Sequence, residues 1–161
     1  MKWLRIVGLW WGLAGFSLLI GSAIFRLLPH ALESIRSGLS LLQWAALFLW
    51  AVFMLVSEGY RGFQKQFAPR FAKRANDLAA SGSLVDVILA PLYCVGYYGA
   101  ERRRIVVSWA LTGGIIVLIV IVRQLAQPWR GIIDFGVVLG LVYGLIAVYL
   151  NSFVKRREAE A

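Results

Sequence analysis

Three charged residues around the start of the last apolar segment are the side chains best placed to do chemistry. Asp134 lies about one turn inside that segment, and Arg130 precedes it by four residues on the same helix face. An ionisable group inside a membrane segment is a functional candidate by default. With Arg123, the pair would line an entrance for an ion or an anionic solute. The simpler interpretation, which we favour, is a salt bridge that fixes the depth of the segment.

Composition restricts the other kinds of site. The chain has one histidine, His30, and one cysteine, Cys94, whereas a metal site needs several His, Cys or carboxylate ligands at matching spacing. No glycine-rich phosphate loop followed by lysine is present. We therefore expect no catalytic residues, no metal and no cofactor, and we interpret Cys94 as a small packing residue.

The overall composition is that of a membrane protein. Of the 161 residues, 60% are hydrophobic, and the mean hydropathy is +0.74, against about 45–50% apolar residues in soluble domains. The net charge of +9 would suggest nucleic acid in a soluble protein. Here the basic residues flank apolar segments, so anionic lipid headgroups are the expected partners and nucleic acid is not.

The apolar segments predict an all-α polytopic membrane protein with four transmembrane helices in a bundle. They cover residues 6–26, 39–56, 105–122 and 131–150, each close to the about 20 residues that cross a bilayer. The whole chain, residues 1–161, is interpreted as one membrane domain. The first segment is longer than the about 7–15 residues of a signal-peptide core, so a retained span is favoured over a cleaved signal.

Residues 57–104 are predicted to form an amphipathic, partly re-entrant cytoplasmic segment. Tyr60, Phe63, Phe67 and Phe71 recur at helical spacing with basic residues around them, which is typical of a helix lying in the membrane interface. Packing of this stripe into the bundle is the alternative. Pro69 should kink the helix or restart it. The predicted contacts with anionic lipid are Arg61, Lys65, Arg70, Lys73, Arg74, Arg102, Arg103 and Arg104.

The stretch 84–99 decides the topology. It is short, and it contains Asp86, Pro91 and Gly96, which disfavour a continuous membrane-spanning helix. We expect it to be interfacial or re-entrant. If it crossed the membrane, the chain would have five spans and the C-terminus would lie on the opposite side.

Basic residues divide unevenly between the two sides of a four-span chain. Two at the N-terminus, eight in residues 57–104 and three in the tail place thirteen on one side, against Arg26, Arg36, Arg123 and Arg130 on the other. The positive-inside bias then predicts cytoplasmic N- and C-termini in a bacterial inner membrane.

Glycines at four-residue spacing predict close helix packing. Gly136, Gly140 and Gly144 lie along one face of the last span, and Gly8 and Gly12 form a second pair in the first span. Packing within the monomer is favoured over contact between copies of the chain. We further expect the first and fourth spans to meet through these glycines.

These patterns favour a non-catalytic membrane protein, an accessory or scaffold subunit that binds lipid and a protein partner. The glycine-lined helix faces and the basic amphipathic segment motivate this hypothesis. The alternative is an oligomeric channel or transporter for a small ion or anionic solute that uses Arg123, Arg130 and Asp134. Homo-oligomerisation is compatible with either function.

Overall fold

The computed structural model describes residues 2–81 and 83–160, and within these residues it is all-helical, with 88% helix and no strand. Its elements are α1 (Lys2–Arg36), α2 (Leu41–Met54), the π-helix η1 (Leu55–Phe67), α3 (Ala68–Ser81), α4 (Leu84–Ile88), α5 (Ala90–Val95), α6 (Arg102–Val122) and α7 (Trp129–Glu160).

Within the described residues, four helical stretches are long and apolar enough to cross a membrane, as the sequence predicted. They are Ile6–Arg36, Leu41–Leu78, Arg102–Val122 and Trp129–Val154. The second stretch has 38 residues, nearly twice the about 20 that a bilayer requires. Its excess length is the first half of the predicted cytoplasmic segment, which continues α2 as η1 and α3.

No break separates α2, η1 and α3. Ser40 begins the helix with a capping box, in which its side chain accepts from the Gln43 amide and the Gln43 side chain accepts from the Ser40 amide. The backbone then stays helical through Met54, Leu55 and Ala68. The π-helix gives way to an α-helix at Ala68, one residue before Pro69, where the missing amide of proline was expected to disturb the helix.

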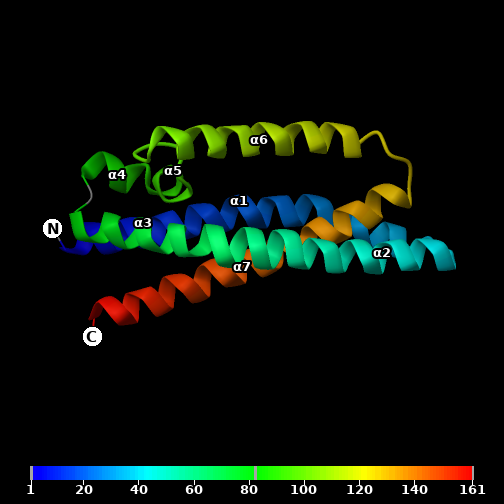
Figure 1. The fold of residues 1–161 in the computed structure, drawn as a ribbon, viewed down its shortest axis with the longest axis horizontal. Coiled ribbons are helices and arrows are strands. Elements are labelled where there is room, and N and C mark those ends of the chain that lie inside the picture. Colours follow the sequence, from blue (N-terminus) through cyan, green and yellow to red (C-terminus); the bar gives the residue numbers. More distant parts are fainter. Residues whose placement is uncertain (1, 82, 161) are drawn as a thin grey trace.

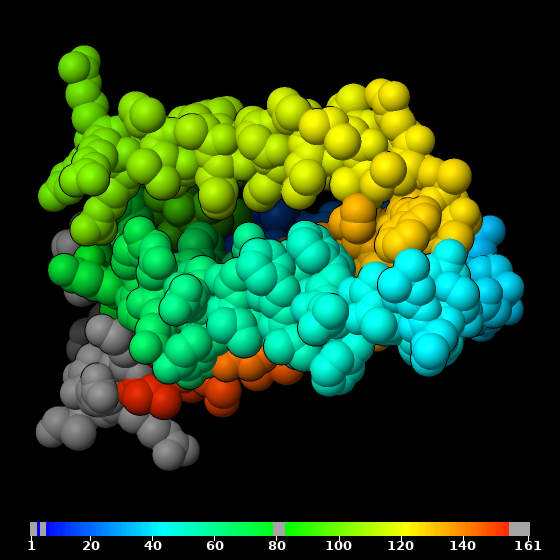
Figure 2. All heavy atoms as spheres, turned by 45° about the vertical axis from the view of Figure 1, so that its right-hand side comes forward, coloured from blue at the N-terminus to red at the C-terminus, as the bar shows by residue number. Residues whose placement is uncertain are grey.

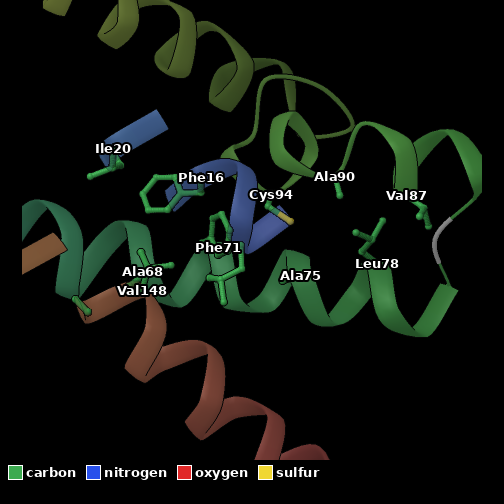
Figure 3. Close-up of a cluster of buried hydrophobic side chains, with 12 residues drawn as sticks. Phe16, Ile20, Ala68, Phe71, Ala75, Leu78, Val87, Ala90, Cys94 and Val148 are labelled. Carbon is green, nitrogen blue, oxygen red and sulfur yellow. The ribbon is translucent and has the colours of Figure 1, made fainter. Parts of the chain in front are cut away.

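Phe63, Phe67 and Phe71 of the aromatic stripe pack against protein, whereas Tyr60 is 41% exposed. Phe67 stacks on Phe16 of α1, with ring centroids 5.2 Å apart, and Phe71, which is 1% exposed, lies equally close to the same ring. Ala68, Phe71, Ala75 and Leu78 join residues of α1, α5 and α7 in the core drawn in Figure 3. The three phenylalanines therefore pack as core, which is the alternative left open above, and Tyr60 does not join them.

Three long helices share this core, and the fourth stands apart. Figure 1 shows α1, α2–η1–α3 and α7 running along one another, with α6 separated from them. In its apolar window α6 is only 6% buried, whereas α7 is 50% buried. A hollow with α1 at its back separates α6 from α2 and η1 in Figure 2. The described helices thus form a three-helix packed unit with a nearly free fourth helix.

The stretch 84–99 forms only the short helices α4 and α5. Both lie at the end of the molecule that carries the two termini, and α6 starts from the same end (Figure 1). The Ser83 side chain caps α4, and Gly96 ends α5 in the left-handed conformation, with φ of 96°. Neither helix traverses the length of the molecule. The start of α1 and the end of α7 lie at the same end of the molecule, as four spans require.

Candidate functional site

Arg130 and Asp134 form an ion pair on the first turns of α7. Their Nε and Oδ2 atoms lie 3.8 Å apart, and the Asp134 side chain is 5% exposed. Both atoms are buried, and neither has a hydrogen-bond partner among the described residues. At this distance the pair is a charge contact and not a hydrogen bond. The structure thus contains the ion pair that the spacing indicated, in a more buried place than a membrane surface.

The C-terminal part of α1 covers this pair. A Cβ added at Gly131 would collide with the His30 carbonyl oxygen and would lie 2.5 Å from the Ser34 Cβ, so α1 and α7 approach closely here. The Gln127 side chain joins the two helices, because its amide donates to Glu33 over 3.3 Å and its oxygen accepts from the Gly131 amide over 3.2 Å. Tight backbone contact therefore shields Asp134 from solvent.

Arg123 does not join the pair. It lies at the end of α6, where it is exposed, and no contact with Arg130 or Asp134 occurs within the described part of the chain. The predicted three-residue entrance is therefore reduced to a two-residue pair inside the α1–α7 contact.

The glycine stripe of α7, which is Gly136, Gly140 and Gly144, faces α2 and η1. A Cβ at Gly136 would overlap the indole of Trp50, and one at Gly144 would overlap the ring of Phe63. Between them, a Cβ at Gly140 would lie 3.2 Å from the Cβ of Glu58. The Trp50 indole also donates to the Ile133 carbonyl over 3.1 Å. This stripe is used for packing within the monomer, as favoured above.

The glycines of α1 face a different partner. A Cβ at Gly8 would lie 3.3 Å from the side chains of Leu78 and Val87, and one at Gly12 would lie 3.0 Å from the sulfur of Cys94. The expectation that the first and fourth spans meet through their glycines is therefore wrong. The small residues of α1 form a groove that receives α4 and α5, which the sequence alone did not place next to α1.

Arg74 holds the chain that leads from α5 to α6. Its Nε donates to the Tyr93 carbonyl over 2.6 Å, and its Nη2 donates to the Tyr98 carbonyl over 2.7 Å. A third bond reaches the Gly99 carbonyl over 3.3 Å, and the guanidinium lies 4.1 Å from the Tyr93 ring centroid. Arginine suits this place because its planar fork can serve several acceptors at once. Arg74 is thus committed to several protein contacts at once, and it is the one member of the predicted set that is not exposed.

The remaining basic residues of that prediction have free surfaces. Arg104 lies 3.9 Å from Glu101, with both side chains more than half exposed, and the Lys65 ammonium lies 4.7 Å from the Tyr60 ring centroid. Arg102–Arg104 begin α6 at the end of the molecule that carries the termini (Figure 1). The exposed bases of the set are Arg61, Lys65, Arg70, Lys73, Arg102, Arg103 and Arg104.

Electrostatics around α4 and α5 follow from capping and burial. The hydroxyl and amide of Ser83 lower the pKa of Asp86, and Tyr98 donates to the same carboxylate over 3.3 Å. Burial, with the Asp86 charge as a second cause, raises the pKa of Tyr98 to about 12. Burial also raises the pKa of Cys94 to about 12, so this thiol is neutral and suited to packing, not to nucleophilic chemistry.

Three features of these sites were not found from the sequence. Gly15 meets the ring of Pro91, but it breaks the four-residue glycine spacing. The Tyr97 hydroxyl shares a 2.6 Å hydrogen bond with Thr112, across a turn whose path the sequence does not define. Gln127 lies in a polar loop. Its role in joining α1 to α7 appears only from its hydrogen bonds to Glu33 and to the Gly131 amide.

Comparisons with known proteins add no relative to this picture. The chain matches no protein-family model, no curated protein and no solved structure.

Proposed function

We propose that the protein is a non-catalytic accessory or scaffold subunit of a bacterial inner membrane, with four spans and cytoplasmic N- and C-termini. In this proposal α4 and α5 lie at the cytoplasmic face, interfacial or slightly re-entrant. The spans complete their bundle with a helix from a partner protein, and the exposed basic residues outside η1 bind anionic lipid headgroups.

The observation that carries the proposal is the isolation of α6. Membrane helices associate through close packing and interhelical hydrogen bonds, and α1, α2–η1–α3 and α7 do so within this chain. A Cβ added at Gly113 or Gly114 of α6 would meet nothing within 4 Å. A span held at its ends and free along its length is suited to packing against another protein.

Charge supports the orientation and the lipid contacts. Arg61 and Lys65 follow Glu58, which lies beside Gly140 in the middle of α7, so the charge asymmetry is taken without them. The remaining eleven bases on the side of the termini still outnumber the four on the other side. Arg102, Arg103 and Arg104 are exposed where α6 starts, which is the depth at which headgroups are expected.

Cross-linking from α6 in native membranes tests the proposal. A photo-reactive residue at Trp109, Leu111 or Ile116, each exposed on α6, should give a protein cross-link from one face of the helix. The same residue at Phe48 of α2, which is also exposed, serves as a control for random collision. Lipid adducts alone from every face of α6, or affinity capture that returns no stoichiometric partner, would contradict a scaffold function.

A channel or transporter is the second candidate, because Asp134 is a buried carboxylate at membrane depth with an unbonded oxygen. Ion and solute flux into liposomes that contain the purified protein separates the two functions. The scaffold proposal predicts no specific flux. Flux that the wild type supports and Asp134→Asn abolishes would favour transport.

A further inference from the structure

Three side chains of η1 are charged and exposed, and we call Glu58, Arg61 and Lys65 the η1 strip. Arg61 and Lys65 are four residues apart on one side of the helix, and the Cβ of Glu58 lies next to Gly140 of α7. Lys65 lies over the ring of Tyr60. Among the residues that the structure describes, Glu58 and Arg61 have neither an ion pair nor a side-chain hydrogen bond. The strip therefore presents charge that this chain does not neutralise.

Contacts with α7 set the depth of the strip. Glu58 lies beside Gly140, Gly59 meets the ring of Tyr143, and Phe63 fills the space over Gly144. These α7 residues lie in the middle of the membrane-length stretch Trp129–Val154. Glu58 is thus level with the centre of the last span, and Arg61 and Lys65 follow toward the end of the molecule that carries the termini.

Contacts with α1 give the same depth independently. Phe16 lies near the middle of the uncharged run from Ile6 to Phe25, and its ring stacks on Phe67 at the end of η1. A bilayer placed to cover the apolar middle of α1 or of α7 therefore includes η1. The sequence interpretation put these bases on the cytoplasmic face because it counted residues after Val56, without the stagger between the helices.

Charged groups at hydrocarbon depth are tolerated when they pair with an opposite charge or face a wet cavity. A lysine near the cytoplasmic end of a span can extend its ammonium toward the headgroups. The Glu58 side chain is short and lies at the centre of the span, so its carboxylate cannot reach the headgroups in this way. The strip carries two positive charges and one negative charge, so one further carboxylate would balance it.

We propose that the η1 strip docks a transmembrane helix of a partner protein that carries an acidic side chain. The carboxylate pairs with Arg61 and Lys65, one to two turns from the bilayer centre toward the termini, because Glu58 repels an acid at the centre itself. Arg61 supplies a planar fork for a bidentate contact, and Lys65 supplies a second charge. This inference rests on the proposed function and names the chemistry of its protein partner.

Designed helices of known sequence test the pairing in phosphatidylcholine liposomes. The probes are polyleucine transmembrane peptides with no acid, with glutamate at the centre, with glutamate one to two turns off centre, or with glutamine at that off-centre position. A donor dye on Gly113→Cys, whose surroundings are open, reports peptide binding by energy transfer. We expect saturable binding of the off-centre glutamate peptide, at least tenfold tighter than that of the other three.

Two matched double variants decide whether the strip is the site. Arg61→Leu with Lys65→Leu should weaken binding of the off-centre glutamate peptide at least tenfold. Arg70→Leu with Lys73→Leu removes the same charge from α3, one to two turns beyond the strip, and should change binding less than twofold. Arg61→Lys keeps the charge but loses the planar fork, so it should weaken binding less than the leucine pair does, even if the leucine variants fold poorly.

Several results would overturn the inference. Equal binding of the leucine and glutamate peptides would show that the glutamate does not contribute to binding. Equal loss of binding in both double variants would show that any nearby positive charge has the same effect. Fast labelling of Ser57→Cys by a membrane-impermeant thiol reagent, not slowed by the off-centre glutamate peptide, would indicate a water-filled groove instead. Cross-linking from α6 is measured separately, so it can support a protein partner while the strip fails.

Discussion

Gly15 of α1 and Pro91 of α5 are in such close contact that a Cβ on the glycine would collide with the proline ring. Together with Gly8 and Gly12, Gly15 makes one side of α1 flat enough to pack against α5, whose first turn contains Pro91. The Trp11 indole closes this contact by donating to the Ile88 carbonyl over 3.1 Å. The path between the second and third spans is thus fixed by the first span.

Enlarging Gly15 should release α5 and expose Cys94. The thiol is 2% exposed, and burial raises its pKa to about 12, so alkylation at pH 8 should be very slow in the wild type. Gly15→Val should raise the alkylation rate at least tenfold. Gly21→Val on the same helix, where a Cβ would meet nothing within 4 Å, should not. An unchanged rate in Gly15→Val would mean that α5 does not depend on the groove.

The glycine stripe of α7 should be intolerant of side chains in a position-dependent way. Gly144→Val should cost about 1–3 kcal/mol of unfolding free energy, because its methyl groups would overlap the Phe63 ring. Gly114→Val on α6 should cost little within the monomer, since a Cβ there meets nothing within 4 Å. Unfolding in detergent micelles measures both values. Phe63→Ala combined with Gly144→Val should recover part of the loss, and no recovery would contradict the overlap.

The Arg74 contacts should control protease access to the start of α6. Arg74→Lys keeps the charge but loses the fork that serves the Tyr93, Tyr98 and Gly99 carbonyls, which should cost about 2–4 kcal/mol of local stability. Trypsin cleavage at Arg102 and Arg103 should therefore accelerate. Arg70→Lys, on the exposed side of α3, is the matched control. Equal cleavage rates in the two variants would contradict a role for the Arg74 hydrogen bonds in holding the start of α6.

The α4 cap should be sensitive to acid. The Ser83 contacts lower the pKa of Asp86 below its usual 3.8, so the carboxylate stabilises the folded cap fully above about pH 4. This contribution is lost as the pH falls through the lowered pKa. The amide-exchange protection factors of α4 should fall over that range, and Ser83→Ala should move the Asp86 titration, followed by NMR, back toward 3.8. A titration unchanged by Ser83→Ala would contradict this origin of the shift.

Periodicity and charge were sufficient to predict helices of membrane length, and they also identified the Arg130–Asp134 pair and the α7 glycine face. Each of these depends on residues near one another in one helix. The second span was predicted to end at Val56, close to the end of α2 at Met54. The sequence did not show that η1 and α3 continue α2 without a break, because Ser57–Gln66 is polar while the Phe63, Phe67 and Phe71 face is apolar. The long-range stacking of Phe16 on Phe67 shows that this continued helix packs against α1.

The isolation of α6 was also beyond sequence reasoning. Its apolar residues surround the helix, which is equally typical of a buried core helix and of a span that faces lipid. The groove for α5 was missed for a related reason, since Gly8, Gly12 and Gly15 specify a close neighbour but not which one. Tertiary contacts, here with Val87, Cys94 and Pro91, supply that choice.

A double-mutant cycle should show strong coupling between Arg130 and Asp134. Removing one partner leaves the other buried charge uncompensated, for which about 3–5 kcal/mol is typical, and the 25% exposure of the Arg130 side chain puts Asp134→Asn at the lower end. The double variant Arg130→Gln, Asp134→Asn should be less destabilised than the sum of the single variants by about 1–3 kcal/mol. Unfolding free energies in micelles measure the cycle.

The exposed Glu101–Arg104 pair provides the control for this cycle. Its nitrogen and oxygen lie 3.9 Å apart, nearly the same separation, but the side chains are 80% and 55% exposed. Water screens such pairs, so its coupling should fall within about 0–1 kcal/mol. Equal coupling in the two pairs would mean that burial by α1 does not strengthen the Arg130–Asp134 interaction. In that case the close approach of Gly131 to Ser34 would serve helix packing alone.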